Sequence, residues 1–230
     1  MKYKHLFFDL DKTLWDFKRN SEETLLELFD NYQLKNIGVE DSKKFIDVYT
    51  EINEKQWADY RAGRVNKEKM RAERFIKTFD VFQVSNDSLA QQLSDDYLEQ
   101  CPEKTYLFPQ TVEVLDYLSG KYLLHIITNG FEEVQHRKMN NCDITKYFTE
   151  IITSEKSGFL KPNPQIFFHA LETTGAVEEE SIMIGDSLEV DILGAREAGI
   201  DQIYFNPDRI EHSEKVTFEI HHLSALTNIL

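Results

Sequence analysis

The chain has 230 residues, and 41% of them are hydrophobic, which is enough to fill a folded core and excludes a disordered chain. Its 41 acidic residues outnumber the 26 basic ones and give a formal charge of −15. This charge disfavours nucleic acid as a partner, because a polyphosphate would be repelled over most of the surface, but it permits a small anion that a metal and a few cations neutralise locally.

The sequence also indicates a compartment. No stretch approaches the ~18–20 apolar residues that a membrane helix needs, and the first apolar run ends at Asp9, which is too early for a signal peptide. The two cysteines, Cys101 and Cys142, are predicted to be free thiols in a reducing environment. We therefore expect a cytoplasmic protein that binds no membrane. A monomer is favoured, although the sequence leaves the oligomeric state open.

The first predicted elements are one strand and a long helical zone. Tyr3 to Leu10 is a compact apolar run that is typical of a buried strand. From Asp16 to Pro102 the apolar residues recur at helical spacing, which predicts a small bundle. Its four helices are predicted to start at Ser21, Asp41, Asn66 and Ser85.

From about Glu103 the predicted elements alternate. Strands are predicted at residues 122–128, 150–153, 181–186, 202–205 and 216–220, and helices at 110–118, 131–139, from 164 onward and at 189–198. Such alternation implies a parallel sheet with helices on both faces. We predict an α/β fold with a doubly wound, Rossmann-like core (residues 1–15 with 103–230) and an inserted α-helical bundle cap domain (residues 16–102). An insertion that leaves the sheet at its carboxyl edge is expected to act as a lid.

Acidic side chains follow two of the predicted strands. Asp9 and Asp11 follow the first strand, and Asp186 and Asp191 follow the strand that ends near residue 186. Ligands collect at the carboxyl ends of parallel strands, and several carboxylates gathered there are costly unless a cation compensates them. Because Mg²⁺ prefers oxygen ligands and keeps waters for an anionic substrate, these residues predict a magnesium site.

Phosphate-binding groups are predicted at two further strand ends. Thr128-Asn129-Gly130 offers a hydroxyl, an amide and a flexible backbone just before a helix N-terminus, which together can hold phosphate oxygens. Lys161 precedes Pro162, which stiffens its position, and an ammonium group there could act as a point charge on a phosphoryl group.

This ordered set resembles the motifs of the haloacid dehalogenase superfamily of phosphohydrolases. The four segments that carry the resemblance are Phe8-Asp9-Leu10-Asp11-Lys12-Thr13-Leu14, Ile127-Thr128-Asn129-Gly130, Lys161-Pro162, and Gly185-Asp186 through Asp191. They occur in the family's order with compatible spacing, and a helical cap lies between the first two. The resemblance therefore covers nearly the whole chain.

The resemblance implies a two-step hydrolysis. Asp9 would attack phosphorus and become an aspartyl phosphate. Asp11 would protonate the leaving alcohol and then accept a proton from the attacking water. Thr128, Asn129 and Gly130 would bind phosphoryl oxygens.

The resemblance also implies the source of positive charge. Lys161 and Mg²⁺ would neutralise the phosphoryl group. The metal would be held by Asp9, Asp186 and the main-chain carbonyl of Asp11, and Asp191 would orient a metal-bound water or Lys161. The dehalogenases of the superfamily lack a carboxylate at the position of Asp11, so its presence indicates phosphate esters. A β-phosphoglucomutase-like phosphomutase retains both carboxylates and stays an alternative.

The substrate is expected to be a small phosphorylated metabolite. Trp15 and Phe17 could stack on a nucleobase, which would favour nucleotides, or they could pack beneath the cap. The segment Leu14-Trp15-Asp16-Phe17 and the long helical cap look most like the branch that includes bacterial pyrimidine 5′-nucleotidases. A phosphoglycolate or sugar-phosphate phosphatase, and a catalytically silent metabolite-sensing scaffold, remain the alternatives.

Overall fold

The computed structural model describes residues 2–230, whose contacts divide the chain into two compact units. The first unit contains the residues up to Phe17 together with Thr105–Leu230, and the second contains Lys18–Lys104. The boundaries expected from the sequence lay at 15/16 and 102/103. None of the helices among residues 2–230 combines the length and the apolar character that a membrane span requires.

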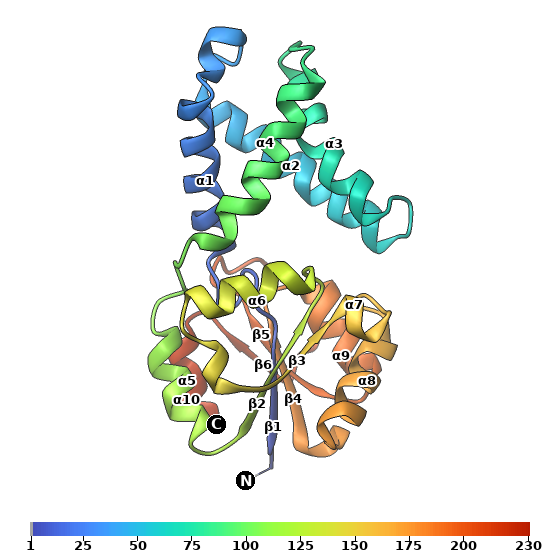
Figure 1. The fold of residues 1–230 in the computed structure, drawn as a ribbon. Helices are drawn as coiled ribbons and strands as arrows, with labels where there is room; N and C mark the ends of the chain where they lie inside the picture. Colours follow the sequence, from blue (N-terminus) through green and yellow to red (C-terminus); the bar gives the residue numbers. More distant parts are fainter. Residues whose placement is uncertain (1) are drawn as a thin grey trace. The chain divides into compact units, whose positions relative to one another are not determined.

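The first unit is built on a parallel sheet with helices on both of its faces (Figure 1). The strands are β1 His5–Phe8, β2 Leu123–Thr128, β3 Phe148–Thr153, β4 Ser181–Gly185, β5 Asp201–Phe205 and β6 Phe218–Ile220. The helices are α5 Thr111–Ser119, α6 Glu132–Asn141, α7 Ser154–Ser157, α8 Pro164–Thr174, α9 Gly194–Glu197 and α10 Leu226–Ile229. The strand order β3-β2-β1-β4-β5-β6 is the doubly wound order, so the predicted fold class is confirmed.

The core of this unit forms because the central strands β1, β2 and β4 are mostly apolar and buried, as burial on both faces demands. Phe7, Ile127 and Met183 project from β1, β2 and β4 into one cluster with Phe167 of α8 and Ala195 of α9, and all five side chains are fully buried. The apolar packing places the carboxyl ends of the central strands at fixed positions relative to one another.

The second unit consists of helices and turns. Its helices are α2 Ser42–Arg61, α3 Lys67–Val81, α4 Asp87–Gln100 and nearly all of α1, which spans Phe17–Asn31. Aromatic rings fill the interior, where the centroids of Tyr49 and Phe75 lie 4.7 Å apart and those of Tyr49 and Tyr97 lie 5.2 Å apart. The guanidinium of Arg74 is buried near the Tyr49 and Tyr97 rings and donates to Asn53 over 3.0 Å.

Local capping residues determine where some helices of this unit begin, but not all of them. Asp41 and Asn66 cap α2 and α3 as predicted, and each side chain accepts from backbone N–H groups of the first turn. The prediction for α1 was wrong, because the helix starts at Phe17 and Ser21 lies inside it, buried, with its hydroxyl 2.8 Å from the Tyr97 hydroxyl. Asn86, one residue beyond Ser85, caps α4.

Two histidines are buried side by side in the sheet. His5 of β1 and His125 of β2 have nearly parallel rings, with Nδ1 of His5 3.1 Å from Nε2 of His125. Nδ1 of His125 has no hydrogen-bond partner among residues 2–230. Burial, and secondarily the charge of His5, lowers the pKa of His125 from 6.5 to about 4. The folded protein therefore keeps His125 neutral at pH values where the unfolded chain protonates it.

We expect the free energy of unfolding to decrease as the pH falls from 6.5 to about 4, because the unfolded chain takes up a proton that the buried ring refuses. The loss attributable to His125 is up to about 3 kcal/mol. Urea unfolding of the wild type and of His125→Phe at several pH values measures it. The wild type should lose stability relative to the variant over this interval, and a constant difference between the two would contradict the assignment.

Candidate active site

The candidate site lies at the carboxyl end of β1, where the order of the strands in the sheet reverses. Strand β1 pairs with β2 on one side and with β4 on the other, so the chain segments that follow these strands diverge at the same edge. Asp9 follows β1, Thr128 ends β2, and Asp186 follows β4. A crevice at such a switch point is where doubly wound sheets bind ligands. The sheet topology thus brings residues from distant parts of the sequence to one place.

Lys161 joins two of the acidic residues. Its ammonium group is buried and lies 2.6 Å from Asp9 Oδ1 and 2.6 Å from Asp191 Oδ1. It also donates to the backbone carbonyl of Ile127 over 2.7 Å. Two hydrogen bonds, to Asp9 and to Ile127, and the ion pair with Asp191 thus hold the ammonium group at one position.

A π-helical turn, Leu188–Leu193, carries Asp191 toward Lys161. The sequence predicted an ordinary helix from 189 to 198, whereas the structure has this turn followed by the short α9. The carboxylate also accepts from the backbone N–H of Ser187 over 3.0 Å. A Cβ atom on Gly185 would lie only 2.5 Å from the carboxyl carbon of Asp191, so the close approach of Asp191 to β4 requires a residue without a side chain.

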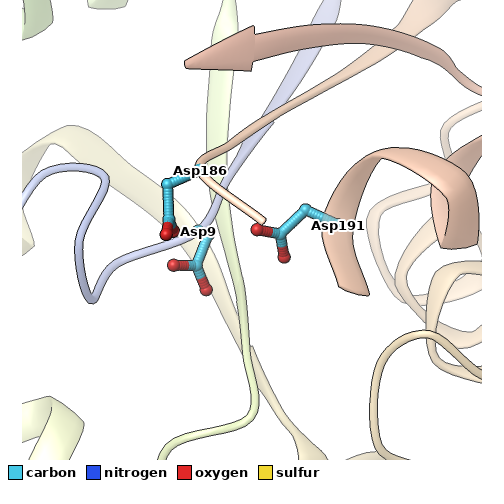
Figure 2. A group of neighbouring side chains, drawn as sticks. All are labelled: Asp9, Asp186 and Asp191. Atoms are coloured by element: carbon cyan, nitrogen blue, oxygen red, sulfur yellow. The ribbon is translucent and has the colours of Figure 1, made fainter. Parts of the chain in front are cut away.

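The charges in this cluster do not balance. One carboxylate oxygen each of Asp9, Asp186 and Asp191 lies within 4.8 Å of the other two (Figure 2), and Lys161 is a cation that contacts two of these residues. Burial raises the pKa of Asp9, and the charges of Asp191 and Asp11 add to this effect, although Lys161 opposes it. Burial also raises the pKa of Asp186, with further contributions from Asp191 and Asp9. The site therefore has an excess of negative charge.

The same cluster keeps Lys161 protonated. Burial disfavours the ammonium form, but the charges and hydrogen bonds of Asp191 and Asp9 outweigh that effect and raise the pKa of Lys161. The lysine is a permanent cation in this environment, and it cannot by itself neutralise three carboxylates. The donor set consists entirely of hard oxygen ligands, so a divalent cation such as Mg²⁺ fits the site, with Asp9 and Asp186 as the carboxylates that would hold it.

Asp11 lies outside this cluster of carboxylates. Lys138 donates to its Oδ1 over 2.6 Å, and Gln135 donates to its Oδ2 over 2.7 Å. The Asp11 side chain keeps 26% of its surface exposed, whereas that of Lys138 keeps 5%. The sequence predicts that Asp11 binds the metal through its main-chain carbonyl, which leaves the carboxylate for another role. The carboxylate is hydrogen-bonded by two side chains of helix α6.

Thr128 and Gly130 also contact α6. The Thr128 hydroxyl oxygen accepts from the backbone N–H of Gly130 over 3.0 Å and from the side chain of Gln135 over 3.2 Å. A Cβ atom on Gly130 would fall 1.4 Å from Nε2 of Gln135, so Gly130 is required for Gln135 to reach Asp11 and Thr128 together. Both bonds use the Thr128 oxygen as an acceptor, which leaves the hydroxyl proton for a further acceptor.

Asn129 has a different place from the one predicted. Its side-chain oxygen accepts from the backbone N–H of Lys161 over 2.7 Å, and its amide nitrogen donates to the Lys161 carbonyl over 2.9 Å. The amide expected to bind phosphoryl oxygens is thus used to clamp the segment that carries Lys161. Asn129 thereby supports the position of the segment that carries Lys161.

Trp15 was considered for base stacking or for packing, and the structure favours packing. Its side chain is fully buried, and the Lys138 ammonium group lies 4.1 Å from the ring centroid. Phe17 contacts the same ring edge-on, with centroids 6.1 Å apart. A ring whose faces are covered has no surface for a nucleobase, so the structure does not support Trp15 as a substrate-binding residue.

Gln135 and Lys138 were not predicted from the sequence as functional residues. The signal that could have revealed them is the helical spacing of α6, which puts these two polar residues on the same face as the apolar Phe131 and Met139. Polar groups on a buried face must be hydrogen-bonded, and their partners are then worth seeking at the neighbouring strand ends.

Comparisons with known proteins agree with this geometry. Residues 6–205 match the family model described as haloacid dehalogenase-like hydrolase, which confirms the resemblance drawn from the four motifs. The pyrimidine 5′-nucleotidase PynA of Streptococcus pneumoniae is 31% identical, over 100% of this chain and 96% of the relative. The pyrimidine 5′-nucleotidase YjjG of Escherichia coli is 30% identical, over 100% of this chain and 99% of the relative.

A similar solved structure is that of the HAD-hydrolase YfnB from Bacillus subtilis, which is described as bound to magnesium and as revealing interdomain movement. It has a TM-score of 0.89 and 27% sequence identity, and the match covers 100% of this chain and 99% of that chain. The fold is thus shared along the full length of the chain.

Proposed function

The chain belongs to the haloacid dehalogenase-like hydrolase family, and on this premise we propose that it is a Mg²⁺-dependent phosphatase of small phosphate monoesters that acts through an aspartyl phosphate on Asp9. Within this class we propose pyrimidine nucleoside 5′-monophosphates as the substrates, because two relatives of about 30% identity over the full length are pyrimidine 5′-nucleotidases.

One observation carries the proposal: Asp9 is held by a buried ammonium group at a carboxylate-rich switch point of the sheet. The Lys161 ammonium group binds Asp9 Oδ1 and also Asp191, so the Asp9 carboxylate is held in place at the end of β1. Its raised pKa reflects burial and nearby negative charge, which a cation would counter. A carboxylate fixed beside positive charge is suited to attack an anionic phosphoryl group.

Mg²⁺, when bound by Asp9 and Asp186, would supply positive charge beside the phosphoryl oxygens. The residues of the chain would do the rest. An Asp9 oxygen bonds to phosphorus while the bond from phosphorus to the ester oxygen breaks, and Asp11 gives its proton to that oxygen. In the second step water attacks phosphorus, its proton passes to Asp11, and the bond to Asp9 breaks to release phosphate. The Thr128 hydroxyl and Lys161 would hold the phosphoryl oxygens.

We also propose a cytoplasmic location and a monomer as the active form. Neither Cys101 nor Cys142 forms a disulfide, which suits a reducing compartment. Nucleotides and other phosphorylated metabolites are available in the cytoplasm, and we propose that a single copy of the chain suffices for activity.

We expect the purified protein with Mg²⁺ to release phosphate from a panel of monoesters, with UMP and dUMP hydrolysed at higher kcat/KM than AMP, glucose 6-phosphate or phosphoglycolate. Phosphate release is measured with Asp9→Asn as the blank. A preference for phosphoglycolate or a sugar phosphate would refute the nucleotide assignment and keep the phosphatase. Conversion of a sugar 1-phosphate to its 6-phosphate without phosphate release would indicate a mutase. The absence of any turnover would indicate a sensing scaffold.

A further inference from the structure

Two side chains of helix α6 hold the carboxylate of Asp11, and neither belongs to the four family motifs. Lys138 Nζ lies 2.6 Å from Oδ1, and Gln135 Nε2 lies 2.7 Å from Oδ2. Each oxygen thus has its own donor. A carboxylate bound at both oxygens cannot rotate about its terminal torsion without breaking a hydrogen bond, so α6 fixes the plane of the carboxyl group.

Lys138 is itself fixed in place. The residue is 4% exposed, and its ammonium group lies 4.1 Å from the Trp15 ring centroid and 5.7 Å from that of Phe17. Burying an ammonium group is costly unless it is paired, and here the charge partner is Asp11, while the aromatic rings add cation–π attraction. The ion pair of Lys138 with Asp11 is therefore a largely buried interaction and not a solvated surface contact.

Gln135 connects the same carboxylate to the phosphate-binding segment. Its amide nitrogen donates both to Asp11 and to the Thr128 hydroxyl oxygen, over 2.7 Å and 3.2 Å. The space that it crosses is available because residue 130 is glycine. One side chain therefore bridges the Asp11 carboxylate and Thr128.

We infer that Lys138 and Gln135 are positioning residues that orient the Asp11 carboxyl group for proton exchange with the leaving alcohol and with water. The inference rests on the proposed phosphatase function and adds a requirement to it. The proton moves from Asp11 to the ester oxygen as the bond to phosphorus breaks, and this transfer depends on the alignment of donor and acceptor.

The choice of leaving group separates this role from a structural one. An alkyl ester such as a nucleoside 5′-monophosphate expels a strongly basic alkoxide and needs the proton, whereas p-nitrophenyl phosphate expels a weakly basic phenolate and does not. The parameter to compare is kcat/KM, since it covers only the steps up to release of the alcohol. Hydrolysis of the aspartyl phosphate, which is common to both esters, does not affect it.

The test compares the wild type with Lys138→Met on both esters, using the best alkyl ester of the substrate panel. We expect kcat/KM to fall by about 10- to 100-fold for the alkyl ester and by less than about 3-fold for p-nitrophenyl phosphate. In the Asp11→Asn background, Lys138→Met should lower kcat/KM for the alkyl ester by less than about 2-fold further, because both changes affect one proton transfer. Lys146→Met, which removes an exposed lysine paired with Asp143, is the matched control.

The possible results decide between the alternatives. Equal losses for the two esters, or full additivity with Asp11→Asn, would show that Lys138 serves only the fold and would overturn the inference. An unchanged or increased kcat/KM for the alkyl ester would overturn it as well. If the wild type hydrolyses neither ester, the proposed phosphatase itself is wrong, and the inference fails with it.

Discussion

The variant Asp9→Asn is expected to lower phosphate release from every monoester by about 10⁴-fold or more, in line with the removal of a nucleophile from other enzymes that act through covalent intermediates. An amide oxygen is a poor nucleophile, and no carboxylate remains where Asp9 meets Lys161 and the converging oxygens of Asp186 and Asp191. Steady-state assays with inorganic phosphate as the readout measure the effect.

The fold of this variant should be intact, since the change removes one negative charge from a cluster that has an excess of them. Lys161 keeps Asp191 as an ion-pair partner. The melting temperature of Asp9→Asn should therefore equal or exceed that of the wild type in the absence of metal. Asp9→Ala is a second variant that cannot revert by deamidation, and Asp143→Asn changes an exposed carboxylate as a control. Retained turnover in both Asp9 variants would exclude Asp9 as the nucleophile.

Removal of Mg²⁺ is expected to abolish turnover reversibly and also to change stability. A ligand that binds only the folded state at 100 times its Kd stabilises that state by about 2.7 kcal/mol, so Mg²⁺ should raise the melting temperature of the wild type. EDTA followed by addition of Mg²⁺ tests activity, and thermal unfolding with and without Mg²⁺ tests binding independently of activity.

The variant Asp186→Asn should separate the effect of this carboxylate on the stability of the metal-free protein from its effect on Mg²⁺ binding. Burial and the charges of Asp191 and Asp9 raise the pKa of Asp186, which means that its ionised form is disfavoured in the metal-free protein. The variant should thus be at least as stable as the wild type without Mg²⁺ and should gain much less stability when Mg²⁺ is added. If it gains the full increment, Asp186 does not hold the metal.

The parts of the fold that depend on local interactions could be predicted from the sequence, and those that depend on distant contacts could not. The alternation of apolar runs and amphipathic segments specified the parallel sheet and the helical insertion, because burial on both faces of a sheet and on one face of a helix leaves a periodic record. Local capping placed the starts of α2 and α3. Ser21 misled the prediction of α1 because its hydroxyl pairs with Tyr97, 76 residues away, and no local pattern records that contact.

The candidate site was predictable because its residues lie on the segments that leave the carboxyl ends of the strands. Asp9, Asp186, Asp191 and Lys161 were expected near one sheet edge, and the structure brings them into one cluster. The orientation of side chains that cross between elements was not predictable. Asn129 turns toward the backbone of Lys161, and Trp15 is covered by Lys138, since packing decides which way each side chain points. The π-helical turn that carries Asp191 likewise has no periodic signature.

The position of β1 in the centre of the sheet has a consequence for biosynthesis. This strand ends at Phe8, but its two neighbours in the sheet begin at Leu123 and Ser181. At a translation rate of ~5–20 residues per second, roughly 6–23 s pass before β2 follows β1 out of the ribosome. The segment His5–Phe8 has no neighbouring strand to pair with during that interval. The helices of residues 18–104 can already form, because their contacts are between neighbouring segments of the chain.

Charged residues flank this waiting strand on both sides. Lys2 and Lys4 precede it, and Asp9 and Asp11 follow it closely. Such charges act as gatekeepers that discourage a nascent apolar segment from pairing with other chains. Asp9 and Asp11, which we propose for catalysis in the folded enzyme, would thus also protect the nascent chain from aggregation before the active site has formed.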